Sequence, residues 1–271
     1  MSLMTISQRV AVITGGAQGI GRRTAELLAD RGFRIAIIDL QEPKAAVQAI
    51  ESRAGEVLWF TGDICREEVV EDFARQVFER FGRIDVLVNN AGISLIHPAE
   101  DTTAAEYRRV MEVNLVAPFL LARTFGRKML EARSGSIVNV ASIAGLVAVS
   151  DRAAYNASKH GLVGLTRTLA AEWGGRGVRV NAVCPGWVKT EMDAADQAHG
   201  TYTDADITRR VPMARFATPD DVARAIAFLA DENESSFVNG HTLTVDGGWS
   251  SDGSWESVRL SKRSEPVKAK S

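Results

Sequence analysis

The sequence predicts an α/β fold with a doubly wound, mainly parallel sheet of seven strands and helices on both faces. Seven short apolar runs alternate with longer segments in which apolar residues recur every three or four positions. Most of the runs are nearly continuous in valine, isoleucine and leucine, as in strands covered on both faces. This alternation favours parallel pairing, because a crossover helix returns each strand in the same direction.

The predicted strands cover residues 9–14, 34–39, 56–61, 83–89, 135–141, 178–184 and 242–246. No linker, repeat or low-complexity segment interrupts residues 4–250, so we expect one domain there. Residues 1–3 precede a second methionine, and we interpret them as a cloning remnant. Residues 251–271 are polar and basic without a clear period, which predicts a flexible tail.

The composition is that of an ordinary globular protein and excludes several classes of function. Of the 271 residues, 45% are hydrophobic and 24% charged, and the net charge of −2 gives no general attraction to nucleic acid or acidic membranes. No apolar run approaches the roughly 20 residues of a membrane span, and no signal peptide precedes the first strand. Cys65 and Cys184 are isolated in sequence, so we expect two buried free thiols, no metal site and a cytoplasmic location.

A glycine-rich turn joins the first predicted strand to a helix. The segment 14–21 reads TGGAQGIG, and glycines at such a turn let the backbone approach a ligand closely. The N-terminus of the following helix presents unpaired N–H groups to an anion such as a pyrophosphate. Strand, turn and helix together predict a Rossmann-like dinucleotide site that includes Gly15, Gln18, Gly19, Ile20 and Gly21.

An acidic residue at the end of the second strand indicates which dinucleotide binds. Asp39 lies 18 residues after Gly21, where a carboxylate accepts hydrogen bonds from the adenosine ribose and repels a 2′-phosphate. Its neighbour Leu40 supplies no positive charge. We therefore predict NAD as the cofactor, with NADP as the minority alternative because Arg22 and Arg23 follow the glycines.

The next strands end in further ligand-binding candidates. Asp63 and Ile64 follow the third strand, and the Asp63 carboxylate suits either the adenine amino group or the N-cap of the next helix. Asn90, Ala91 and Gly92 follow the fourth strand, where small residues let the backbone pass close to a ligand.

Tyr155 and Lys159 lie four residues apart in a predicted helix, which places both side chains on one face. A neighbouring ammonium favours the phenolate, so we expect Lys159 to lower the pKa of Tyr155 toward neutrality. A tyrosine with a lowered pKa is a general acid or base.

Six segments occur together in a familiar order: TGGAQGIG, NNAG, the stretch around Asn114, Ser142, YNASK and PGWVKT. In order and spacing they resemble the short-chain dehydrogenase/reductase family, in its short single-domain branch with the TGxxxGxG turn. The resemblance covers residues 7–250. It implies hydride transfer between NAD(P) and an alcohol or carbonyl, and a homotetramer as the common assembly.

The resemblance also implies roles for individual residues. Ser142 would hold the substrate oxygen, Tyr155 would exchange the proton, and Lys159 would also bind the nicotinamide ribose. The segment with Pro185, Gly186, Val188 and Thr190 would bind the nicotinamide carboxamide.

Asn114 lies in a segment that is typical of a helix, despite Pro118. Proline has no N–H, so the carbonyl of Asn114 loses its usual helical partner. That carbonyl would hold a water on the family's proton path through Lys159; a simple proline kink is the alternative.

Residues 191–213 are expected to form a mobile lid over the substrate. The candidate pocket residues lie on this lid, after the fourth strand, after Ser142 and in the PGWVKT segment. They are Ser94, Ile96, Ser142, Leu146, Tyr155, Trp187 and Met192.

We therefore predict a cytosolic NAD-dependent alcohol dehydrogenase or carbonyl reductase with Asn114, Ser142, Tyr155 and Lys159 as its catalytic set. Because the loops lack positive clusters, the substrate is expected to be a polyol, a sugar or another small hydroxy compound. The alternatives are an NADPH-dependent 3-oxoacyl thioester reductase and a non-catalytic nucleotide sensor on the same fold. Neither a nucleic-acid nor a membrane partner is expected.

Overall fold

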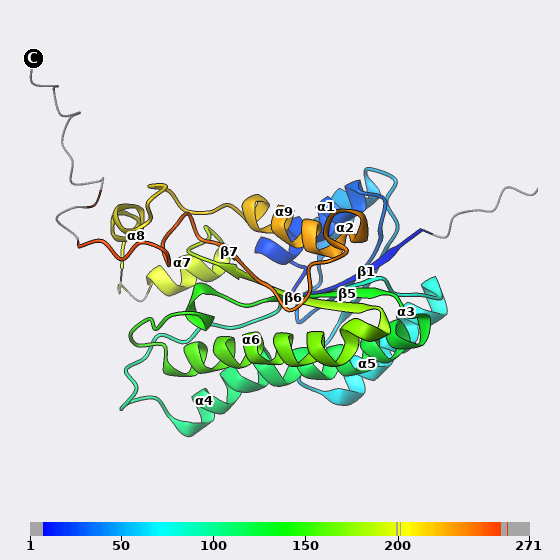
Figure 1. Cartoon of the computed structure of the whole chain (residues 1–271), viewed down its shortest axis with the longest axis horizontal. Coiled ribbons are helices and arrows are strands. Elements are labelled where there is room, and N and C mark those ends of the chain that lie inside the picture. Colours follow the sequence, from blue (N-terminus) through cyan, green and yellow to red (C-terminus); the bar gives the residue numbers. More distant parts are fainter. Residues whose placement is uncertain (1–7, 199, 201, 256–258, 260–271) are drawn as a thin grey trace, which may run out of the picture.

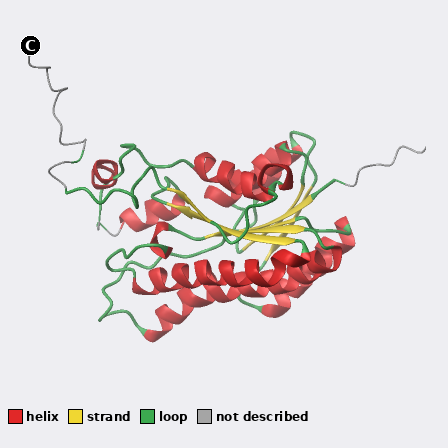
Figure 2. Cartoon of the chain, in the orientation of Figure 1, coloured by secondary structure: helices red, strands yellow, loops and turns green. Residues whose placement is uncertain are grey.

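The computed structural model describes residues 8–198, 200, 202–255 and 259, and its centre is a seven-stranded sheet (Figures 1 and 2). All neighbouring strands pair in parallel, in the order β3-β2-β1-β4-β5-β6-β7. The strands are β1 (Val10–Thr14), β2 (Arg34–Asp39), β3 (Val57–Thr61), β4 (Val86–Asn89), β5 (Gly135–Val140), β6 (Val178–Pro185) and β7 (Thr242–Val245). The predicted α/β fold and parallel sheet are confirmed.

The strand order reverses beside β1, which pairs with β2 on one side and with β4 on the other. In open parallel sheets a ligand crevice forms at such a point, beyond the carboxyl ends of the strands. Six strand positions agree with the predicted ranges to within one residue at each end. The fourth strand begins at Val86 instead of residue 83, and Arg83 and Asp85 form an ion pair just before it.

The helices form one layer on each face of the sheet (Figure 2). Helices α1, α2 and α9 cover one face, and α3, α5 and α6 cover the other. The helices are α1 (Gly19–Asp30), α2 (Lys44–Glu51), α3 (Glu67–Phe81), α4 (Ala104–Met111), α5 (Ala117–Ala132), α6 (Ala153–Trp173), α7 (Glu191–Ala198), α8 (Asp204–Arg210), α9 (Pro219–Ala230) and α10 (Glu232–Ser235).

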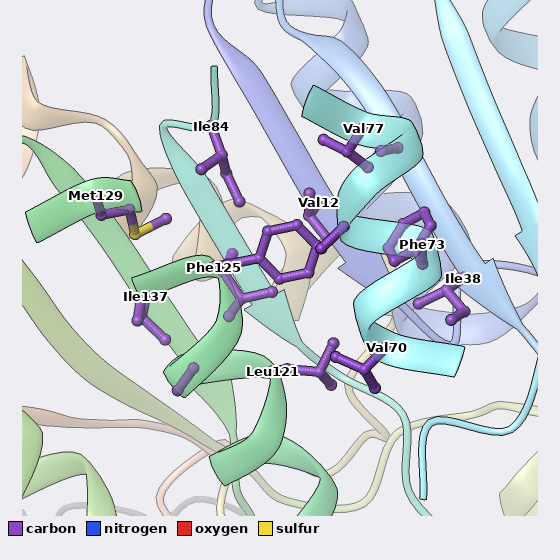
Figure 3. Packing of buried hydrophobic residues seen from close by; sticks show 14 of the residues in the cluster. Val12, Ile38, Val70, Phe73, Val77, Ile84, Leu121, Phe125, Met129 and Ile137 are labelled. Carbon is purple, nitrogen blue, oxygen red and sulfur yellow. The ribbon is translucent and has the colours of Figure 1, made fainter. Parts of the chain in front are cut away.

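Buried side chains between α3, α5 and the sheet make one of the hydrophobic cores (Figure 3). Phe73 of α3 and Phe125 of α5 are fully buried and meet edge to face with ring centroids 5.9 Å apart. Burying an aromatic side chain contributes roughly 1.5–3 kcal/mol, and this geometry adds about 0.5–1.5 kcal/mol. The packing holds the central strands, and so the carboxyl edge of the sheet, in a fixed arrangement.

The sheet is less covered at its edges than the apolar runs suggest. Every residue of β3 is at least partly exposed, and Trp59 keeps 41% of its surface accessible. β3 has a neighbour on one side only, which explains this exposure. Cys184 is buried as expected, whereas Cys65 is only partly buried; both thiols are free.

The chain ends are described only in part. Residues 1–3, interpreted as a cloning remnant, lie outside the described residues, and of the predicted tail only 251–255 and 259 are described. None of the described helices has the length and apolar character needed to cross a membrane.

Candidate active site

A cavity of about 460 Å³ opens at the carboxyl edge of the sheet, beside the point where the strand order reverses. Its wall collects residues from the turns after β1, β2, β3, β4, β5 and β6, and from α6 and α7. It includes every predicted cofactor residue except Gly21, and of the predicted catalytic set it includes Ser142, Tyr155 and Lys159.

The glycine turn is packed too tightly for a side chain at Gly21. A Cβ there would lie 2.0 Å from the carbonyl oxygen of Gly15 and 2.4 Å from Nδ2 of Asn90. Asn90, which follows β4, holds the turn by donating to the carbonyls of Thr14 and Gly15 at 2.9 and 3.0 Å. Gly21 therefore shapes the turn from behind the cavity wall.

The N-terminus of α1 faces the cavity and is suited to an anion. Its N-cap residue, Gln18, makes no side-chain capping hydrogen bond, and the first turn carries no acidic residue. Gly19 has φ +55°, and a Cβ there would lie 3.4 Å from Oε2 of Glu191, so the turn closely faces the first residue of the predicted lid. Uncapped N–H groups and the helix dipole match a pyrophosphate, so this part of the cavity fits a dinucleotide.

Asp39 ends β2 and lines the cavity. Its Oδ2 accepts from the N–H of Ala17 at 2.9 Å, and its Oδ1 accepts from the N–H of Gln41 at 3.0 Å. The carboxylate thus ties the glycine turn to β2 while facing the cavity. The predicted NADP alternative depended on two arginines, but Arg22 pairs with Glu26 at 2.8 Å and Arg23 with Asp220 at 2.7 Å, and neither lines the cavity.

Asp63 also lines the cavity, with Ile64 beside it. The alternative role as a helix cap is wrong, because α3 begins at Glu67 with Arg66 as its N-cap. Asp63 instead accepts from the N–H of Cys65 at 3.0 Å and pairs with Arg109 at 3.4 Å. Burial raises the pKa of Asp63, but these hydrogen bonds and the arginine charge outweigh it, and the pKa lies below its usual value.

Tyr155 and Ser142 meet in the cavity wall. Ser142 caps the short helix η2 (Ile143–Gly145) by accepting from the N–H of Ala144 at 3.1 Å, so it has a structural role as well. Burial raises the pKa of Tyr155 above its ordinary value, while the hydrogen bond with Ser142 and the charge of Arg152 oppose the rise. Tyr155 is therefore a neutral phenol at pH 7, able to give a proton without further change.

Lys159 is almost completely buried, one helical turn after Tyr155. Its Nζ donates to the carbonyl of Val140 at 2.9 Å and lies 5.6 Å from the Tyr155 ring centroid. Burial lowers the pKa of Lys159 to about 8. The expected depression of the Tyr155 pKa is not observed, because burial of the phenol outweighs the hydrogen bond with Ser142 and the charge of Arg152, which are the influences that lower it.

Asn114 lies in a π-helical turn, η1 (Glu112–Val116), between α4 and α5. The helix continues through Pro118 as expected, but the wider turn that accommodates the proline was not predicted. Asn114 is fully buried, and its side chain pairs with both backbone groups of Ile93, at 2.9 Å to the N–H and 3.0 Å to the carbonyl. A Cβ on Gly92 would lie 3.2 Å from Asn114 and 3.6 Å from Nζ of Lys159, so the three positions are neighbours.

The predicted pocket residues divide into two groups. Ser142, Tyr155, Trp187 and Met192 line the cavity, whereas Ile96 and Leu146 do not, and Ser94 is tied to lining residues by hydrogen bonds. Leu146 instead packs against the buried cluster beside α6. Sequence reasoning missed the polar lining residues Arg109, Arg152, Asp193, Asp196 and Tyr202. Only Arg152 carried a usable signal, because it lies three residues before Tyr155.

Known proteins resemble this chain over nearly its whole length. A family model described as enoyl-(acyl carrier protein) reductase matches residues 15–250. D-threitol dehydrogenase of Mycolicibacterium smegmatis is 42% identical over 245 residues, covering 89% of this chain and 92% of that protein. NAD-dependent glycerol dehydrogenase of Listeria innocua is 34% identical over 244 residues, covering 90% and 94%.

Solved structures agree with these relatives. A variant of actinorhodin polyketide ketoreductase with NADPH superimposes with a TM-score of 0.86 at 34% identity, covering 90% of this chain and 97% of that one.

Proposed function

Because this chain belongs to the short-chain dehydrogenase/reductase family, we propose that it transfers a hydride between NAD(H) and a secondary alcohol or ketone. The single observation that carries the proposal is the grouping of Ser142, Tyr155 and Lys159 on one wall of a cavity whose other wall fits a dinucleotide. A nucleotide sensor would need the wall that fits a dinucleotide, but it would not need the wall with Ser142, Tyr155 and Lys159.

Each of these side chains has a distinct task. The Ser142 hydroxyl binds the substrate oxygen, and the Tyr155 hydroxyl exchanges the proton at that oxygen: it donates in reduction and, as phenolate, accepts in oxidation. Lys159 holds its position through the carbonyl of Val140 and binds the ribose nearest the reaction. When bound, the nicotinamide ring supplies the hydride acceptor in oxidation and the hydride donor in reduction.

Asn114 stabilises the backbone next to this arrangement. Its side-chain amide clamps the backbone of Ile93 and takes no direct part in the chemistry. The proposed water path rests on the carbonyl of Asn114, whose usual helical partner would be the N–H that Pro118 lacks, within the π-helical turn.

The proposed preference for NAD rests on Asp39, so a substitution of this residue tests it. In Asp39→Ala the carboxylate that repels a 2′-phosphate is removed, so the ratio of kcat/KM for NAD over NADP is expected to fall by about 10–100-fold. Steady-state rates with both cofactors measure it. Asp30→Ala, an exposed aspartate that pairs with Arg53, is the matched control and should leave the ratio unchanged. An unchanged ratio in Asp39→Ala would assign cofactor choice to other residues.

The raised pKa of Tyr155 predicts different pH profiles for the two directions. Oxidation needs the phenolate, whose fraction grows as the pH rises toward a pKa above the ordinary value near about 10. Oxidation should therefore accelerate from pH 7 to pH 9, while reduction, which needs the phenol, should show no such acceleration. Rates at saturating cofactor in both directions check this, and an oxidation rate that falls over the same interval would contradict it.

For the substrate we propose a polyol, sugar or similar small hydroxy compound. The support is the cavity's hydrogen-bonding wall together with the relatives named for D-threitol and glycerol. Turnover over a panel of polyols, sugars, cyclic alcohols and 3-oxo thioesters tests the class. Preferred turnover of 3-oxo thioesters with NADPH would favour the thioester-reductase alternative.

We further propose a cytoplasmic homotetramer. The free thiols suit a reducing compartment. The apolar side chains of α6 pack inside the chain, since Leu162, Val163 and Leu169 are buried. Trp249, which follows β7, packs on Trp187 with ring centroids 5.1 Å apart. Contacts between subunits would have to use other surfaces, such as the exposed Phe119 of α5.

A further inference from the structure

Beyond Tyr155, the cavity ends in a polar group of side chains to which the proposed chemistry assigns no role. Arg152, at the start of α6, and Asp196, on α7, both line the cavity. The Arg152 guanidinium carbon lies 5.9 Å from the centroid of the Tyr155 ring. This group therefore faces whatever part of a substrate extends away from the reacting carbon.

The group is a closed triangle of hydrogen bonds. Arg152 donates through Nη2 to Oδ2 of Asp196 at 3.0 Å and through Nη1 to Oγ of Ser94 at 2.6 Å. Ser94 in turn donates to the same Oδ2 at 3.1 Å. The Arg152 and Asp196 side chains are only 12% and 15% exposed, so they are held in place and little screened by solvent.

The backbone beneath the triangle is anchored as well. The N–H of His97 donates to the carbonyl of Asp151 at 2.8 Å, and His97 forms a strand-like bridge to Arg152. The segment after β4 and the start of α6 are thereby joined, and Ser94 and Arg152 come from these two segments. Three stretches far apart in sequence thus build one rigid face.

The arginine and the aspartates of this face are each paired with an opposite charge. Arg152 is neutralised by Asp196, and the nearby Asp193 is paired with Lys189 at 3.1 Å and accepts from the hydroxyl of Tyr202 at 3.0 Å. Both contacts to Asp196 use Oδ2, which leaves Oδ1 to accept from a ligand. Such a face offers donors and acceptors to hydroxyl groups, while a carboxylate arriving there meets two aspartates and an arginine already occupied.

Resting on the proposed function, we propose that the Arg152–Asp196–Ser94 triangle selects uncharged polyols over hydroxy acids of the same length. Asp196 is the specificity-determining residue, since its carboxylate is the acid that pairs with Arg152 in the cavity wall. Without the aspartate charge, the guanidinium would pair with a substrate carboxylate.

The experiment compares each polyol of four to six carbons with the aldonate of the same length, such as D-threitol with D-threonate. Calorimetric titration in the presence of NADH gives binding, and steady-state rates give kcat/KM. In Asp196→Asn, aldonate affinity should rise relative to polyol affinity by about 10–100-fold, the worth of one hydrogen bond to a charged group. Asp30→Asn, the same change at an exposed aspartate that pairs with Arg53 outside the cavity, should leave the ratio unchanged.

The double variant Arg152→Gln with Asp196→Asn distinguishes two causes of a gain in aldonate binding: the unpaired charge of Arg152, and the loss of the contact between Arg152 and Asp196. It keeps hydrogen-bonding side chains without either charge, and should not gain aldonate binding. Gain in the double variant, or no gain in Asp196→Asn, overturns the proposal. Binding is measured without turnover, so it tests the selectivity of the triangle even if the protein oxidises no polyol. A failure to oxidise any polyol would count against the proposed function alone.

Discussion

Tyr155→Phe is expected to lower kcat by about 10²–10⁴-fold while NADH affinity changes by less than about threefold. The variant removes the one hydroxyl that exchanges the proton at the substrate oxygen and leaves the ring that fills the cavity wall. Turnover of a polyol measures the first effect, and quenching of protein fluorescence by NADH measures the second. Because the ring is kept, no cavity forms and folding should be preserved.

Tyr107→Phe is the control, because this tyrosine is 38% exposed on α4 and does not line the cavity. Its turnover should equal that of the unmodified protein. If Tyr155→Phe retained more than about a tenth of the activity, proton transfer would have to pass through another group, and the assigned role of Tyr155 would be wrong.

Gly21→Ala should weaken NADH binding by about 100-fold, since a shift of roughly 1 Å at a binding turn has effects of that size. The added Cβ would lie 2.0 Å from the carbonyl oxygen of Gly15, and backbone cannot rotate away as a side chain does. The turn must move, and the overpacking should lower the free energy of unfolding by about 1–3 kcal/mol. Fluorescence titration and chemical denaturation measure the two effects.

Gly164→Ala gives the opposite expectation for the same chemical change. Gly164 lies inside α6, and apart from the helix's own backbone no atom of the described residues lies within 4 Å of an added Cβ, so alanine should raise the free energy of unfolding by about 0.5–1 kcal/mol. NADH affinity should stay the same. Equal NADH binding by Gly21→Ala and Gly164→Ala would show that the turn tolerates a side chain, contrary to the packing.

Local patterns in the sequence were enough for the strands and for the cofactor wall. The apolar runs marked the seven strands because a buried strand needs several consecutive apolar residues and little else. The glycine turn and Asp39 were also readable, since a strand, a turn and a helix adjacent in sequence make that part of the cavity. Tyr155 and Lys159 were readable for the same reason, being one helical turn apart.

The sequence did not predict features that form where segments distant in the chain meet. The π-helical turn at Asn114 depends on how α4 and α5 pack, and the pKa of Tyr155 depends on how much of the chain covers it. A neighbour four residues away is visible in sequence, but desolvation is a sum over the whole fold. The cap role suggested for Asp63 failed because α3 begins four residues after it, at Glu67.

The sequence by itself determined the α/β fold, the dinucleotide turn and the Tyr155–Lys159 pair, because each depends on residues close together in the chain. Only the tertiary structure decided the substrate end of the cavity. Ser94, Arg152 and Asp196 belong to three separate segments, and no local pattern shows that they meet, although Ser94 was predicted for the pocket and Arg152 lies three residues before Tyr155. Their meeting follows from the sheet, which brings the segments after β4, β5 and β6 to one edge, and it is there that the charge offered to a substrate is set.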